Sequence, residues 1–207
     1  MDAGEHLRYS SLILLGHGGG QHKTAPGTLS RARRYAAEGF AVVAIDAPNH
    51  GDRPKDGEFR RIAAKMRAGM AAGENPGAPV AGMHSNLAGQ VVADWQAVLT
   101  AVQRLDQVGV GPVGYCGMSM GCGLGIPLIA AEPRIRAAVQ GLLGVHGVAE
   151  HVARITVPVQ FLAQWTTRWC RGTRAWPCST PWPRLRKRRT PTPASTGMCR
   201  RSKWTVR

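Results

Sequence analysis

One serine in this chain has the surroundings of a nucleophile. It is Ser119, in the segment Tyr115-Cys116-Gly117-Met118-Ser119-Met120-Gly121-Cys122-Gly123. An apolar run leads into this Gly-x-Ser-x-Gly pattern and a helix-compatible run follows it, which is typical of a nucleophile elbow, a sharp strand-to-helix turn. Backbone must approach such a strained serine closely, so glycines are needed where a Cβ atom would clash. The pattern predicts that the Ser119 hydroxyl attacks a carbonyl carbon.

A second motif, Gly16-His17-Gly18-Gly19-Gly20, directly follows an apolar run near the N-terminus. A loop of this type can present a backbone N–H to an oxyanion, together with the N–H of the residue after the nucleophile, here Met120. We favour Gly19 as the donor from the loop, with Gly18 as the alternative. The motif could also be only a flexible turn. A phosphate-binding loop is disfavoured because the Gly-Lys-Ser/Thr sequence is missing.

A third motif, Asp46-Ala47-Pro48-Asn49-His50-Gly51-Asp52-Arg53, follows the next apolar run. Such a segment is expected at the carboxyl edge of the sheet, where ligands gather. We take His17 and His50 as possible pocket residues. His50 could instead brace its own loop, which is the commoner use of such a residue in a turn. A role of Asp46 as a catalytic acid is a weaker hypothesis than either role of His50.

Short apolar runs alternate with helix-compatible stretches as far as residue 165. Strands are predicted at residues 11–16, 40–46, 113–116, 137–143 and 157–163. Helices are predicted at residues 26–38, 58–70, 86–105 and 121–131, with Ser85 as the N-cap of the third. Continuous apolar runs separated by helices indicate a mostly parallel sheet that is covered on both faces. The predicted fold class is therefore an α/β three-layer sandwich.

Taken together, the three motifs resemble the α/β-hydrolase superfamily, especially its dienelactone-hydrolase and esterase-like members. The resemblance runs from about Leu12 to Trp165 and rests on GHGGG, DAPNHGDR, GYCGMSMGCG and their spacing. It implies that Ser119 is the nucleophile and that Gly19 and Met120 form the oxyanion hole. The family also implies a catalytic acid after a late strand and a histidine near the C-terminus. This sequence has no Asp or Glu after Glu150 and no His after His151.

The chain changes composition near Trp165. Residues 1–165 hold 15 basic and 12 acidic residues, a net charge of +3, whereas residues 166–207 hold 12 basic and no acidic residues. Four of the six tryptophans and three of the five cysteines also lie after residue 165, where neither a helical nor a strand period is visible. We assign residues 1–165 to an incomplete hydrolase core whose last strand and helix are missing. Residues 166–207 form a basic tail that is either disordered or out of frame.

Codon arithmetic favours the second interpretation of the tail. The alternative reading frame starts on the last base of the Trp165 codon. The codons that can encode residues 166–171 allow this frame to encode Asp-Asp-Glu-(Met or Val)-Val-Pro directly after residue 165. The same frame permits Gly-His-Val across residues 196–198. These are the types of residue that a serine hydrolase needs at these places. We therefore interpret the sequence after about Trp165 as a frameshifted C-terminus, which would leave this chain inactive or nearly so.

The leading function is hydrolysis of an ester, lactone or related acyl bond in a small-molecule substrate by Ser119. A peptidase of the same superfamily is the nearest alternative, because an elbow and an oxyanion loop do not separate ester from amide. A non-catalytic protein that binds nucleic acid through its basic tail is the alternative from another class, disfavoured because the charge is confined to that tail. No cofactor or metal is implied. No membrane span and no signal peptide are expected, so the predicted location is cytoplasmic.

Overall fold

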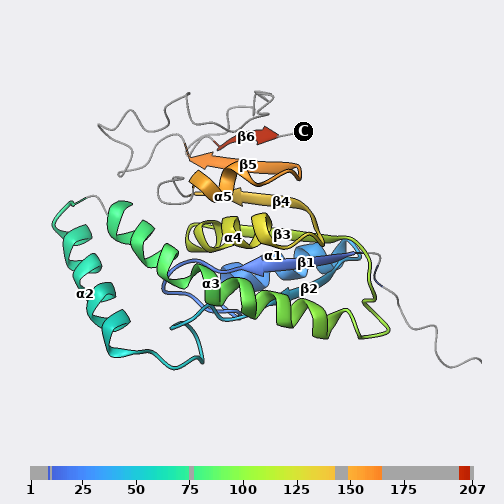
Figure 1. Cartoon of the computed structure of the whole chain (residues 1–207), viewed down its shortest axis with the longest axis horizontal. Coiled ribbons are helices and arrows are strands. Elements are labelled where there is room, and N and C mark those ends of the chain that lie inside the picture. Colours follow the sequence, from blue (N-terminus) through green and yellow to red (C-terminus); the bar gives the residue numbers. More distant parts are fainter. Residues whose placement is uncertain (1–8, 10, 75–76, 143–148, 165–200, 206–207) are drawn as a thin grey trace, which may run out of the picture.

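The computed structural model describes residues 9, 11–74, 77–142, 149–164 and 201–205. Within these residues a six-stranded sheet has the order β2-β1-β3-β4-β5-β6 (Figure 1). Its first five strands are parallel, and β6 runs antiparallel to β5. The strands are β1 (Leu12–Gly16), β2 (Ala41–Ala44), β3 (Val113–Met118), β4 (Ile135–Gly141), β5 (Val159–Gln164) and β6 (Arg201–Thr205).

Helices cover both faces of the sheet, which confirms the predicted α/β three-layer architecture. The helices are α1 (Pro26–Ala37), α2 (Gly57–Ala71), α3 (Gly77–Val102), α4 (Met120–Ala131) and α5 (Ala149–Ala153). Alternating residues of β3 show the two sides: Tyr115 packs against α4, whereas Cys116 contacts Tyr35 of α1. Helix α2 lies beyond the carboxyl ends of the strands (Figure 1). None of the helices in the described ranges is long and apolar enough to cross a membrane.

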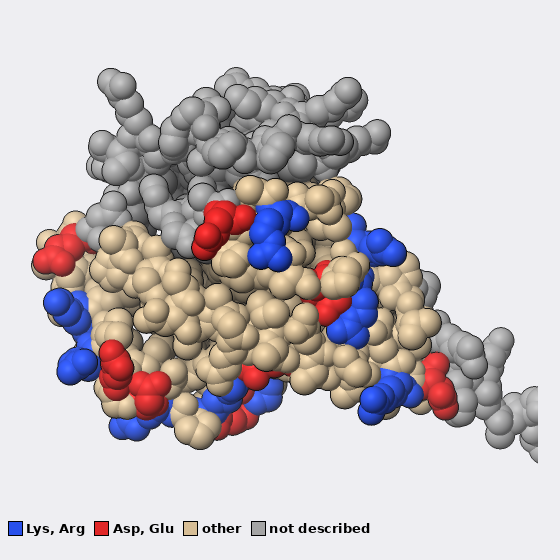
Figure 2. Space-filling view, in the orientation of Figure 1, with Lys and Arg blue, Asp and Glu red and all other residues tan. Residues whose placement is uncertain are grey.

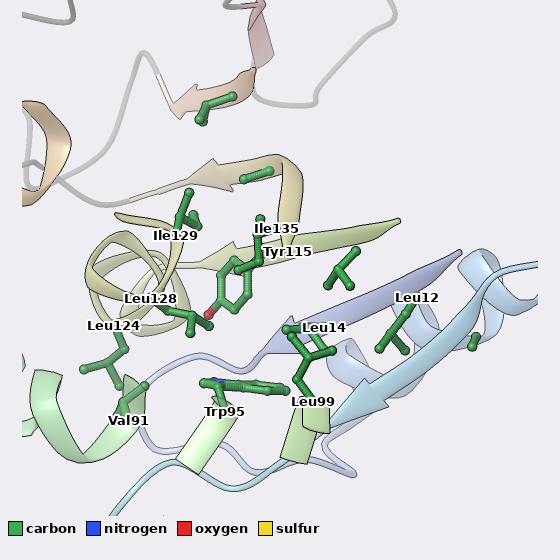
Figure 3. Packing of buried hydrophobic residues seen from close by; sticks show 14 of the residues in the cluster. Leu12, Leu14, Val91, Trp95, Leu99, Tyr115, Leu124, Leu128, Ile129 and Ile135 are labelled. Atoms are coloured by element: carbon green, nitrogen blue, oxygen red, sulfur yellow. The ribbon is translucent and has the colours of Figure 1, made fainter. Parts of the chain in front are cut away.

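The main hydrophobic core lies between the sheet and the helices α3 and α4 (Figure 3). Leu14 and Leu99 are fully buried in it, and the rings of Trp95 and Tyr115 meet edge to face with their centres 6.2 Å apart. Such pairs add about 0.5–1.5 kcal/mol to the burial of their apolar surface. This packing fixes the end of β3, and with it the turn that carries Ser119.

Helix α3 differs from the prediction at its N-terminus. It begins at Gly77 rather than at residue 86, so Ser85 lies inside the helix and the prediction that it is an N-cap is wrong. Pro79 stands in the first turn of the helix, where a missing N–H does no harm because that group would have no partner in the helix. As a result, His84 is a buried helical residue and not part of a loop.

Strand β6 is the second difference. The composition after residue 165 indicated no strand, yet Arg201–Thr205 pairs with β5 from Gln160↔Thr205 to Gln164↔Arg201. The pairing satisfies backbone groups of β5 that would otherwise face solvent at a sheet edge. The expected absence of a final helix concerns residues outside the described ranges. On the face shown in Figure 2, basic and acidic side chains are interspersed over the described residues.

Candidate active site

Ser119 occupies the turn between β3 and α4, as the elbow pattern predicts. Its backbone has φ 54° and ψ −121°, a conformation that is rare for any residue with a side chain. The serine is exposed, and its hydroxyl makes no capping hydrogen bond to α4. Its own N–H donates to the carbonyl oxygen of Gly141 at 2.8 Å, which ties the turn to the end of β4. The strained turn thus leaves Ser119 exposed, with a side chain that does not cap the helix that follows it.

The two glycines of the elbow pattern are required by close backbone contacts. A Cβ atom on Gly117 would lie 2.2 Å from the carbonyl oxygen of Gly121, and one on Gly121 would lie 2.7 Å from that of Gly16. Below the turn, the buried Tyr115 hydroxyl donates a 2.7 Å hydrogen bond to the carbonyl oxygen of Gly121. Burial raises the pKa of Tyr115 strongly, so this hydroxyl keeps its proton.

Two backbone N–H groups that have no acceptor among the described residues lie beside Ser119. The N–H of Met120 opens α4 and has no partner within the helix. Gly19 is exposed, and a Cβ atom placed on it would lie 3.8 Å from Cβ of Met120, so the glycine turn lies next to the elbow. The N–H of Gly18 already donates to Oε1 of Gln21 at 3.3 Å. No hydrogen bond involves the Gly19 N–H among the described residues, which makes it the more available of the two.

The two histidines considered for the pocket both contact backbone. Nδ1 of His17 lies 2.9 Å from the carbonyl oxygen of Gly18, and Nε2 accepts from the N–H of Ala47 at 3.0 Å. These contacts place the proton of the neutral ring on Nδ1. Burial lowers the pKa of His17, which favours the neutral ring that these two contacts require. Nδ1 of His50 lies 2.9 Å from the carbonyl oxygen of Pro48, within its own loop.

Asp46, considered as a catalytic acid, is instead held by the loop that carries the glycine turn. Its carboxylate accepts from the backbone N–H of Lys23 at 2.7 Å, from Lys23 Nζ at 2.6 Å and from the N–H of Asp52 at 3.1 Å. Burial alone would raise the pKa of Asp46, but these hydrogen bonds outweigh it and lower the pKa to about 2. The sequence contains no signal that pairs residues 23 and 46, so sequence analysis missed this contact.

A small cavity of about 20 Å³ lies between the elbow, the two loops and α3, enough for about one water molecule. His17 and Asp46 are among its lining residues, and His50 is not. Asp94 of α3 also lines it and accepts a 2.5 Å hydrogen bond from Arg53, which joins α3 to the loop after β2.

Among the residues that the structure describes, none is recorded as hydrogen-bonding to the Ser119 side chain, so they offer no acid–histidine pair to this hydroxyl. Residues 165–200, where the family order would place both groups, lie outside the described ranges. His151 lies on the short helix α5, and His146 also falls outside the described residues. Among the residues that are described, no group of three or more His, Cys, Asp or Glu side chains could hold a metal ion.

His84 is a further buried histidine, on the N-terminal part of α3. It is 3% exposed, and its Nε2 has no hydrogen-bond partner among the described residues. Burial, helped by repulsion from His50, lowers its pKa to about 4 from 6.5. The unfolded chain protonates this imidazole more readily than the folded chain does. The contribution of His84 to the free energy of unfolding should therefore be fully present above pH 6.5 and decline as the pH falls towards 4.

We expect His84 to contribute up to about 3 kcal/mol of the stability lost between pH 6.5 and 4. Urea unfolding of the wild type and of His84→Leu at pH 7 and at pH 4.5 measures this contribution. The variant should show a smaller difference between the two pH values. His22→Gln, which changes an exposed histidine, should keep the wild-type difference. Equal losses in wild type and His84→Leu would contradict the prediction.

Comparison with known proteins assigns the chain to a family. A family model described as the Alpha/beta hydrolase family matches residues 12–203. Among solved structures, the PEG-bound complex of a cold-adapted esterase from an Arctic intertidal metagenomic library is 31% identical, with a TM-score of 0.58 over 76% of this chain and 62% of that one. The native structure of a cold-adapted esterase from such a library is 27% identical, with a TM-score of 0.51 over 76% of this chain and 60% of that one.

The chain thus spans about three-fifths of the length of these two esterase structures. None of the curated proteins matches it. The family match covers all three motifs of the candidate site, and the order of the parallel strands and the turn at Ser119 fit it. The chain belongs to the alpha/beta hydrolase family.

Proposed function

We propose that the site is that of a serine hydrolase that cleaves an ester, lactone or related acyl bond of a small molecule. One observation carries the proposal: the exposed Ser119 stands in a strained turn beside the unoccupied N–H groups of Met120 and Gly19. A hydroxyl placed in this way can reach a carbonyl carbon while both amides face the oxygen that becomes negative. The likeness to a cold-adapted esterase supports ester chemistry, as does the resemblance to dienelactone hydrolases.

In the proposed reaction, Oγ of Ser119 attacks the carbonyl carbon and its proton passes to a base. The tetrahedral intermediate carries an oxyanion that accepts hydrogen bonds from the N–H groups of Gly19 and Met120. The C–O bond then breaks as the base returns the proton to the departing alcohol, and water hydrolyses the acyl-serine and restores the Ser119 hydroxyl. Each amide that donates to the oxyanion is worth about 3 kcal/mol of transition-state stabilisation in comparable enzymes.

The base and its orienting acid are not among the residues after β5, because the sequence has no Asp or Glu after Glu150 and no His after His151. We propose that the intact protein supplies them from the other reading frame of residues 166–207, with an acid directly after β5 and a histidine further on. This order, serine then acid then histidine, is the one expected of the fold.

Two steps test the proposal. The DNA sequence of the gene should show that a one-base change near codon 165 opens a frame encoding an acid, a downstream histidine and a longer chain. That longer chain should hydrolyse p-nitrophenyl acetate, and its Ser119→Ala variant should lose nearly all of the rate. An acyl p-nitroanilide measured in parallel separates the esterase from the peptidase. A longer chain without Ser119-dependent hydrolysis of either compound would refute the proposed function.

A further inference from the structure

We propose that Asp46, acting through Lys23, is a positioning residue that holds the glycine turn beside the elbow, so that the Gly19 amide faces the oxyanion. The inference rests on the proposed function of Ser119. It assigns Asp46 a role in binding the transition state without contact to the substrate.

The glycine turn has little internal support. Two hydrogen bonds lie within Gly18–Gln21, and both join Gly18 to Gln21. The N–H of Gln21 donates to the carbonyl oxygen of Gly18 at 3.1 Å, and the N–H of Gly18 donates to Oε1 of Gln21 at 3.3 Å. Gly20 has φ 70°, a conformation that glycine adopts readily, and Gly19 is exposed. A turn of this kind keeps one position only if the residues on either side of it are anchored.

Both anchors of the turn lie on two consecutive residues after β2. On its N-terminal side, Nε2 of His17 accepts from the N–H of Ala47 at 3.0 Å. On its C-terminal side, Lys23 donates to Asp46 from its backbone N–H at 2.7 Å and from Nζ at 2.6 Å. The glycine turn thus lies between two contacts to the same segment, Asp46 and Ala47. We call these contacts, made by His17 and Lys23 to residues 46 and 47, the loop clamp.

Asp46 is built into this position. Its side chain is 4% exposed, and each of its oxygens accepts at least one of the three hydrogen bonds from Lys23 and Asp52. A Cβ atom on Gly51 would lie 2.2 Å from Cγ of Asp46, so the loop after β2 packs directly onto the carboxylate. A buried carboxylate with filled hydrogen bonds is suited to fixing backbone and poorly suited to carrying protons during a reaction.

Lys23 is a better residue to substitute than the buried Asp46, because its side chain is 36% exposed. Replacing that side chain leaves the hydrogen bond from the backbone N–H of residue 23 to Asp46 in place. In the 207-residue chain, hydrogen–deuterium exchange should be about tenfold faster for residues 17–23 in Lys23→Met, since one charge-assisted hydrogen bond to the clamp is lost. Nζ of Lys23 also donates to the exposed carboxylate of Asp52, so Lys23→Met removes that hydrogen bond as well. Lys23→Arg should restore slow exchange. Lys65→Met removes an exposed lysine of α2 and serves as the matched control. Unchanged exchange in Lys23→Met would overturn the inference.

Phenylboronic acid gives the second measurement, because it reports on the oxyanion site of the chain as it stands. Oγ of Ser119 adds to boron, the hydroxyl proton is released to water, and the tetrahedral boron becomes anionic beside the two amides. Boron NMR should detect this adduct in the wild type and not in Ser119→Ala. Lys23→Met should bind about tenfold more weakly, and Lys23→Arg like the wild type.

The results separate the two proposals. An adduct that depends on Ser119 and weakens in Lys23→Met but not in Lys65→Met supports both. An adduct with equal affinity in Lys23→Met overturns the positioning role and leaves the proposed function standing. Absence of any Ser119-dependent adduct overturns the proposed function of this site, and the positioning role with it.

Discussion

Replacing Gly121 with alanine is expected to destabilise the chain by about 3 kcal/mol or more, enough to remove most of the folded protein. The new Cβ atom would meet the carbonyl oxygens of Gly16 and His17, at the end of β1 and directly after it, at 2.7 and 3.0 Å. Both contacts are to backbone, which cannot turn away as a flexible side chain can. Relief would require that α4 move from β1, and the Tyr115 hydrogen bond to the Gly121 carbonyl would be strained as well.

A matched glycine in the same chain provides the control. Gly89 is exposed inside α3, and nothing lies within 4 Å of where its Cβ atom would be. Gly89→Ala should therefore stabilise the helix by about 0.5–1 kcal/mol. Urea unfolding followed by circular dichroism at 222 nm measures both variants. A Gly121→Ala midpoint equal to that of the wild type would show that the elbow is not packed closely against β1.

The sequence was informative wherever local chemistry decides the structure. The strand, strained serine and helix of the elbow follow from a short pattern, because only glycine tolerates the approach of backbone at residues 117 and 121. The parallel sheet follows from apolar runs that lie between helices. The start of α3 was missed, because Ser85 has the chemistry of an N-cap while the residues before it are equally able to continue the helix.

The contacts that position the site could not be predicted from the sequence. Lys23 and Asp46 are separated by 23 residues, and either one alone reads as an ordinary loop residue. The ion pair of Arg53 with Asp94 joins a loop to a helix across an even longer separation. Such pairs are set by the path of the whole chain. The sequence motifs predict the candidate nucleophile and the candidate oxyanion donors. The contacts that hold these groups in place can be seen only in the tertiary structure.

The chain of 207 residues is expected to hydrolyse p-nitrophenyl acetate no faster than its Ser119→Ala variant. A serine hydroxyl needs a base within hydrogen-bond reach to take its proton. His17 is near the elbow, but its Nε2 already accepts the Ala47 N–H, and burial lowers its pKa. The amides of Gly19 and Met120, which we propose as the donors to the oxyanion, cannot accept the proton that the attacking hydroxyl loses.

The longer chain encoded by the other frame should exceed this rate by about 10⁴-fold or more, the loss usually seen when a triad histidine is removed. Stopped-flow or plate assays of p-nitrophenolate release, with Ser119→Ala subtracted in each background, measure the ratio. A Ser119-dependent rate in the 207-residue chain would mean that an imidazole already present serves as the base. His146→Gln and His151→Gln would then test the two late imidazoles, since the variant that removes the base abolishes that rate while leaving the urea midpoint in place.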